Sequence, residues 1–217
     1  PESPHTYLDT FKENFNLKKI GAERQFIYFL FGICLIVAAS SIAAPLQSVY
    51  FIHERGVSDR WMGIWAMALS IGAVFGTLIW RKLQNTRGSY AIFSWTVPIS
   101  GVYFLLIILA PNVELILMAT LFAGWMNAGT DVGIWLGLFR YGSEARRTML
   151  INIYIGFALG IPFIAAFFIP FLTNRFTLTE IFIGSFIVRT LVGLYFKIPS
   201  VYALLKDQVP NNPSESR

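Results

Sequence analysis

The residues best suited to chemistry lie in one long apolar stretch, residues 114–139, which carries a single carboxylate well inside it, Asp131. The stretch is long enough to cross a bilayer, because about 20 apolar residues suffice. An ionisable side chain at that depth is costly, so it usually faces a protein interior or a wet cavity and marks a functional site. Such a carboxylate could bind a cation or carry a proton.

Two stripes of side chains run along the helix that this stretch predicts. Asn127, Asp131 and Trp135 recur every four residues on one face. Glycines recur every four residues from Gly129 to Gly137, on a roughly opposite face, because each residue turns the helix by about 100°. Small residues let a neighbouring helix approach closely. We therefore expect the polar stripe to face whatever the bundle of helices encloses.

Arg189 supports a rival interpretation of Asp131. It lies about as far from the end of its own apolar segment as Asp131 does, so the two side chains could pair at one depth. Asp131 would then hold helices together instead of binding a substrate, and a protonated Asp131 could do the same. An arginine can also extend its long side chain to the membrane surface.

The composition predicts an integral membrane protein made of helices. Of the 217 residues, 55% are hydrophobic and only 13% are charged, whereas soluble domains carry about 25% charge. Helices and closed barrels are the structures that satisfy every backbone group in lipid, and barrel strands would alternate instead of running apolar. Cys34 is the only cysteine, and the two histidines stand alone. We therefore expect neither a metal site nor a cofactor.

Six apolar segments predict six membrane-spanning helices with short loops. The expected spans are 25–54, 61–80, 90–110, 114–139, 148–172 and 178–197. Pro45 should kink the first helix or end its regular part, because proline lacks the backbone N–H. Residues 1–24 are expected to be a cytoplasmic arm, either a short helix on the membrane surface or disordered, residues 25–198 the bundle, and residues 199–217 a disordered tail.

The basic residues predict the orientation of the bundle. Six spans place both termini on one side of the membrane, and the segments on that side carry most of the lysines and arginines. The opposite turns carry only Arg55, Arg60 and Arg175. Because cytoplasmic loops hold the excess of Lys and Arg, we expect both termini in the cytoplasm. The net charge of +5 then reflects topology, and no nucleic-acid partner is expected.

Catalytic motifs are missing from the loops. The sequence has no P-loop, no HExxH motif, and no histidine beside a serine or cysteine within one loop. Short loops also leave little room for a catalytic site. We therefore expect a protein that is not an enzyme.

Residues 44–90 resemble the seventh and eighth helices, with the following loop, of transporters of the major facilitator superfamily. The basic segment Arg81–Ser89 is predicted as a turn and resembles that superfamily's loop signature, G-x-L-a-D-r-x-G-r. Leu83 and Gly88 match it, whereas Arg81 stands at its first glycine and Asn85 at its aspartate. The family's aspartate takes part in charge contacts that latch two halves together, and Asn85 cannot supply that charge.

Two later segments extend the resemblance. Residues 123–147 resemble the tenth helix and its cytoplasmic loop, and Asn152–Phe163 the eleventh. The family consists of two six-helix bundles with the substrate near the midplane between them. The resemblance implies that this chain is the C-terminal bundle, that its first and fourth spans line the central cavity, that the second and fifth flank it, and that the third and sixth face lipid.

The resemblance implies secondary active transport of a small molecule by alternating access, in the plasma (inner) membrane of a bacterium. The N-terminal half would be part of the same chain or a second subunit. Asp131 would bind a cation or a proton. The residues expected to shape the substrate site are Asn127, Trp135, Gln47 and Tyr50.

Two other functions remain open. The chain could be a non-transporting subunit of a larger membrane complex, or a half-transporter that acts as a homodimer. A cavity lined by polar residues favours a transporter, whereas an Asp131 sealed against Arg189 favours the structural subunit.

Overall fold

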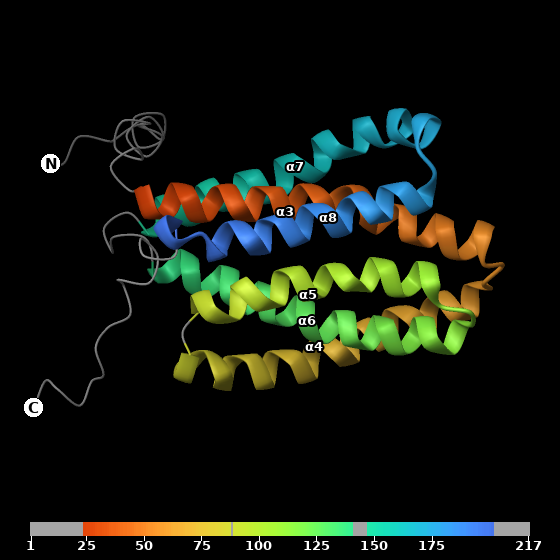
Figure 1. Ribbon diagram of the computed structural model, residues 1–217, viewed down its shortest axis with the longest axis horizontal. Helices are drawn as coiled ribbons and strands as arrows, with labels where there is room; N and C mark the ends of the chain where they lie inside the picture. The colour runs from red at the N-terminus through yellow and green to blue at the C-terminus, as the bar shows by residue number, and fades with distance from the viewer. Residues whose placement is uncertain (1–23, 88, 141–146, 202–217) are drawn as a thin grey trace, which may run out of the picture.

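The computed structural model describes residues 24–87, 89–140 and 147–201, and within these ranges the chain is helical, without strands (Figure 1). Six helices in these ranges are long and apolar enough to cross a membrane, and the predicted all-α fold is confirmed. The elements are α3 (Arg24–Val49), η1 (Tyr50–Glu54), α4 (Asp59–Arg87), α5 (Ser89–Leu109), α6 (Val113–Arg140), α7 (Arg147–Arg175) and α8 (Leu178–Lys197).

The predicted turn at the basic segment is wrong for most of its length. Helix α4 continues through it to Arg87. The segment is rich in arginine, lysine, leucine and glutamine, which are good helix formers whether or not lipid surrounds them. Gly88 lies outside the described residues. The end of the apolar run therefore marked the end of the membrane span but not the end of the helix.

Helices α3 and α5 each contain a proline. Pro45 lies inside α3, whose regular part continues to Val49 and then widens into the π-helical turn η1. Pro98 lies inside α5, and its ring packs directly against Gly193 of α8: a Cβ on Gly193 would lie only 2.6 Å from the Cδ of Pro98.

The predicted tail begins with ordered residues. Pro199–Val201 is still helical, and Val201 is buried. The arm at residues 1–23 and the tail from residue 202 lie outside the described residues.

Glycines bring two helices into the closest backbone contact of the bundle. A Cβ on Gly72 of α4 would collide with the carbonyl of Leu121, and one on Gly124 of α6 with that of Leu69. A Cβ on Gly76 would lie 2.6 Å from the carbonyl oxygen of Trp125. The backbones of α4 and α6 therefore lie in close contact. The glycine stripe of α6 packs against aromatic rings instead, as at Gly133, where a Cβ would lie 3.0 Å from Phe93.

The buried core falls into two apolar clusters at opposite ends of the bundle. One contains Phe29, Phe93 and Phe196, with ring centroids 4.7 Å apart for the last two. The other contains Tyr50 and Phe182, whose centroids are 5.3 Å apart. On each of α3, α5, α6 and α8, the residues between the two clusters include polar ones. The fold therefore holds a polar layer between two apolar layers.

Helices α3, α7 and α8 form one side of the bundle and α4, α5 and α6 the other, with α5 packed on α8 (Figure 1). The start of α3 and the end of α8 lie at the same end of the bundle. The family resemblance predicts that α5 faces lipid, yet α5 has the most buried apolar stretch, 56%, because it lies between α6 and α8. Helices α4 and α7 are the most exposed, with 11% and 6% of their apolar stretches buried.

Candidate functional site

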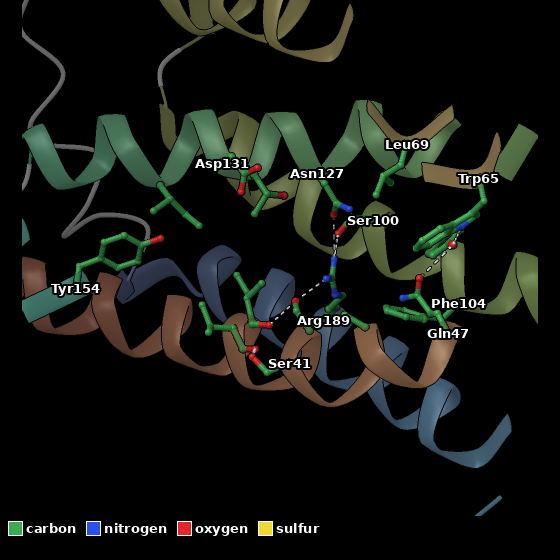
Figure 2. Close-up of a pocket in the computed structure, with 17 residues that line it drawn as sticks. Ser41, Gln47, Trp65, Leu69, Ser100, Phe104, Asn127, Asp131, Tyr154 and Arg189 are labelled. Atoms are coloured by element: carbon green, nitrogen blue, oxygen red, sulfur yellow. Dashed lines mark hydrogen bonds between the residues drawn. The ribbon is translucent and has the colours of Figure 1, made fainter. Parts of the chain in front are cut away.

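A cavity of about 380 Å³ lies in the polar layer, mainly between α3 and α6 (Figure 2). Helices α5 and α8 supply further lining residues, and α4 and α7 supply three at its flanks. Its polar lining side chains are Ser40, Ser41, Gln47, Ser100, Tyr103, Asn127, Thr130, Asp131, Tyr154 and Arg189, with a tryptophan, Trp65. Helices α3 and α6 are the two that the family resemblance places at a central cavity.

Arg189 is the most buried charged side chain of the site, with 6% of its surface exposed. Its Nη1 donates to the Ser100 hydroxyl at 2.6 Å and to the Asn127 side-chain carbonyl at 3.3 Å. Its Nη2 donates to the Ser40 hydroxyl at 2.6 Å. The guanidinium also lies 5.4 Å from the centre of the Phe104 ring. One side chain thus connects α8 to α3, α5 and α6.

Asp131 lies one turn beyond Asn127 on α6 and is exposed to the cavity (Figure 2). No hydrogen bond or ion pair joins it to Arg189 in the described structure, although the two charges interact through space. Asp131 lies eight residues before Phe139, and Arg189 eight residues before Lys197, at the ends of their spans. At 1.5 Å per residue, both lie roughly 12 Å along their helices from those ends.

Gln47 lies at the other end of the same cavity. Its side-chain carbonyl accepts a hydrogen bond from the Tyr103 hydroxyl at 3.3 Å. The Trp65 indole N–H donates to that hydroxyl at 3.1 Å. This chain connects α3, α5 and α4, so Gln47 is held in place by neutral partners.

Two residues expected at the substrate site lie outside the cavity lining. Tyr50 is buried in the second apolar cluster, where its hydroxyl accepts a hydrogen bond from the Arg55 side chain at 3.1 Å. Trp135 packs its ring 5.9 Å from that of Tyr154, which does line the cavity. Trp135 directly follows the lining residue Ile134 and Tyr50 lies three residues after Gln47, so their side chains leave the helix in other directions than those of the lining residues.

The residues of the loop signature are distant from this cavity. Arg81 and Leu83 belong to the cytoplasmic end proposed for α4, where Arg81 is exposed. The side chain of Asn85 and the whole of Gly88 lie outside the described part of the chain. The latch function of this segment remains a prediction.

The sequence did not predict several of the lining residues. The Ser40 hydroxyl donates to the Ile36 carbonyl of its own helix at 2.7 Å and also accepts from Arg189. Ser100 and Tyr154 carried no motif. The depth of Ser100 could have identified it. Ser100 lies at the middle of the span Ala91–Leu109, and a buried arginine requires hydrogen-bond acceptors at its own depth in the bundle.

The site offers charge and hydrogen bonds for recognition. Within the described ranges, no group of three His, Cys, Asp or Glu side chains comes together as a metal site would need. What the cavity contains is one carboxylate, one guanidinium and a set of hydroxyl and amide groups between apolar walls. This combination can bind and orient a small polar molecule.

No protein-family model matches the chain, and neither a curated protein nor a solved structure is detectably similar to it. The cavity and the motifs named above therefore carry the proposed function.

Proposed function

We propose that this chain is one six-helix half of a secondary active transporter of the major facilitator type, which moves a small molecule across the membrane by alternating access. The observation that carries the proposal is a polar cavity, containing Asp131 and Arg189, in the middle of a bundle of membrane-spanning helices. Transporters of this kind bind substrate near the bilayer midplane between two bundles. Asp131 binds a cation or a proton there.

The arrangement of the two charges favours this role over structural glue. Protein interiors are close-packed, and voids larger than a water molecule are few. A charge pair that only held helices together would be in direct contact, because a buried unpaired charge is costly. Here Arg189 bonds neutral partners, Asp131 faces the cavity, and the space between the helices stays open.

The exposed helices support the presence of a second bundle. Helices α4 and α7 flank the cavity and carry exposed apolar side chains along their length, among them Phe75, Leu78, Phe163 and Phe167. A second six-helix half that packs against both helices would close the cavity from the open side. That half belongs to the same full-length chain or to a second subunit.

A non-transporting subunit of a larger membrane complex is the second candidate, and the same exposed faces favour it. The aromatic side chains along α7 would suit packing against another membrane protein as well as against a transporter half. The two candidates differ in whether the cavity becomes open to both sides of the membrane.

Cysteine accessibility tests the proposal without knowledge of the substrate. Ala44 lines the cavity, so Ala44→Cys in the full-length protein, with Cys34→Ala and any other cysteine replaced, provides one reporter. An impermeant maleimide should label it in both right-side-out and inside-out vesicles. Leu191→Cys, on the outward face of α8, is the control and should resist labelling from either side. Labelling of Ala44→Cys from one side only would contradict alternating access.

A further inference from the structure

The cavity contains two charged groups with unused bonding capacity. A guanidinium carries five N–H donors, and Arg189 uses three of them, on Ser100, Asn127 and Ser40. Its Nε N–H is buried without a partner. Asp131, for its part, accepts no hydrogen bond from any described residue. A ligand in the cavity could therefore bond to both groups.

The two groups are separated by about one helical turn. Arg189 reaches α6 at Asn127, and Asp131 is four residues further along, about 6 Å at 1.5 Å per residue. They are thus too far apart to form an ion pair, yet both line one cavity. A molecule with an anionic group and a cationic group a few bonds apart could contact both at once.

The balance of charge selects among possible ligands. With Asp131 ionised, its negative charge and the positive charge of Arg189 cancel. A bound anion would leave one negative charge in the cavity and a bound cation one positive charge, and a net charge in an apolar surrounding is expensive. A dipolar ligand adds no net charge to the cavity. Resting on the proposed function, we propose that the substrate is a small dipolar molecule of the amino-acid class, with its carboxylate at Arg189 and its ammonium group at Asp131.

The walls around the two groups suit such a molecule. The Tyr154 ring, supported by the Trp135 ring, lies on the Asp131 side of the cavity, and aromatic faces attract ammonium groups. Ile36, Leu69 and Ile134 form apolar walls that an aliphatic or aromatic side chain would contact. The volume of about 380 Å³ is at the small end of ligand sites.

The experiment uses the purified full-length protein in detergent and compares ligands by thermal stabilisation and calorimetric titration. The common amino acids are screened first, and a matched series is built on the one that binds best. For leucine the series is leucine, leucinamide, which keeps only the ammonium group, and 4-methylpentanoate, which keeps only the carboxylate. The dipolar member should bind at least about tenfold more tightly than either singly charged member, because each lost charged hydrogen bond is worth more than 1 kcal/mol.

Variants separate recognition from structural support. Asp131→Asn should weaken the dipolar probe at least about tenfold and should strengthen the carboxylate-only probe, because Arg189 then carries the uncancelled charge that this anion neutralises. Arg189→Lys should weaken both probes that carry a carboxylate and leave leucinamide unchanged. Glu114→Gln and Arg175→Lys, exposed on α6 and α7, are matched controls with no effect. A purely structural role would instead weaken all three probes alike and would overturn the assignment.

Three results would overturn the dipolar class: no amino acid binds, a singly charged probe binds as tightly as the dipolar one, or an anion binds together with a proton taken up from solution. Cysteine accessibility uses no ligand, so it separates the two proposals. Two-sided labelling without amino-acid binding refutes the substrate class alone. One-sided labelling with amino-acid binding refutes transport and leaves the binding site.

Discussion

At the scale of single residues, Arg189 depends on its three acceptors. The Ser100 hydroxyl accepts one of its two shortest bonds, at 2.6 Å, and is itself buried. Ser100→Ala should lower the stability of the protein by about 1–3 kcal/mol, because it removes a bond to a buried charged group. Thermal melting in detergent measures the effect. Ser70→Ala is the control, since that hydroxyl is exposed and bonds its own helix, and an equal loss in both variants would contradict the prediction.

The charge of Asp131 also predicts a pH dependence. A carboxylate is charged at neutral pH and is protonated on acidification, which would leave Arg189 as the single charge in the cavity. The affinity for a dipolar ligand should therefore be highest near neutral pH and fall in acid. Asp131→Asn should remove most of this slope in calorimetric titrations from neutral pH down to about pH 4, where an ordinary aspartate becomes protonated. A wild-type affinity that rises in acid would contradict a charged Asp131 in the site.

The sequence predicted the site in part. Asp131, Asn127 and Gln47 line the cavity because a polar side chain in a span rarely faces lipid. Trp135 was grouped with Asn127 and Asp131 by helical spacing, and Tyr50 was expected there from the family resemblance. Spacing along one helix does not say which neighbouring helix covers each turn. That information lies in the packing of six helices, and for the same reason the acceptors of Arg189 on α3 and α5 could not be identified.

At the scale of elements, the close contact between α4 and α6 depends on glycines, which carry no side chain. Gly72→Ala would place a methyl group against the Leu121 carbonyl, and neither backbone can move without separating the helices. We expect a loss of about 1–3 kcal/mol, as for other overpacked sites. Gly63→Ala on the same helix is the matched control, since nothing lies within 4 Å of its Cβ. Melting temperatures should fall for the first variant and stay level or rise slightly for the second.

The turn after α3 is held by one arginine. Arg55 donates to the carbonyls of Ile107 and Ile108 at the end of α5, at 3.2 and 2.7 Å, and to the Tyr50 hydroxyl. Arg55→Gln should lower the melting temperature, with a cost of about 1–3 kcal/mol, because two carbonyls at a helix end lose their partner. Arg175→Gln is the control. If η1 owed its position to Pro45 alone, Arg55→Gln would have no effect.

Helix limits were predictable where hydrophobicity determines them. The spans that end at Glu54 and Lys197 match the structure, because charged residues there leave the apolar layer. Helix α4 continues to Arg87 because backbone hydrogen bonds do not require an apolar environment. Hydropathy thus predicts where a helix leaves the lipid. It does not predict where the helix stops.

At the scale of the whole molecule, the uneven distribution of basic residues predicts the orientation. Ser58 and Lys82 are exposed at opposite ends of α4. Ser58→Cys should react with an impermeant maleimide only from outside intact cells, and Lys82→Cys only in inside-out vesicles, because basic segments stay in the cytoplasm. Both variants are made in a background without other cysteines. The reverse pattern would place the termini outside the cytoplasm.

The position of Arg189 in the chain affects how the bundle is made. It belongs to α8, whereas Ser40, Ser100 and Asn127 belong to helices that are synthesised before α8. An arginine at the centre of a span costs about 2.5–3.5 kcal/mol on insertion into lipid. Helix α8 therefore enters the membrane more readily once α3, α5 and α6 are in place, because their side chains accept hydrogen bonds from its guanidinium. Insertion of α8 is therefore coupled to the assembly of the helices that precede it.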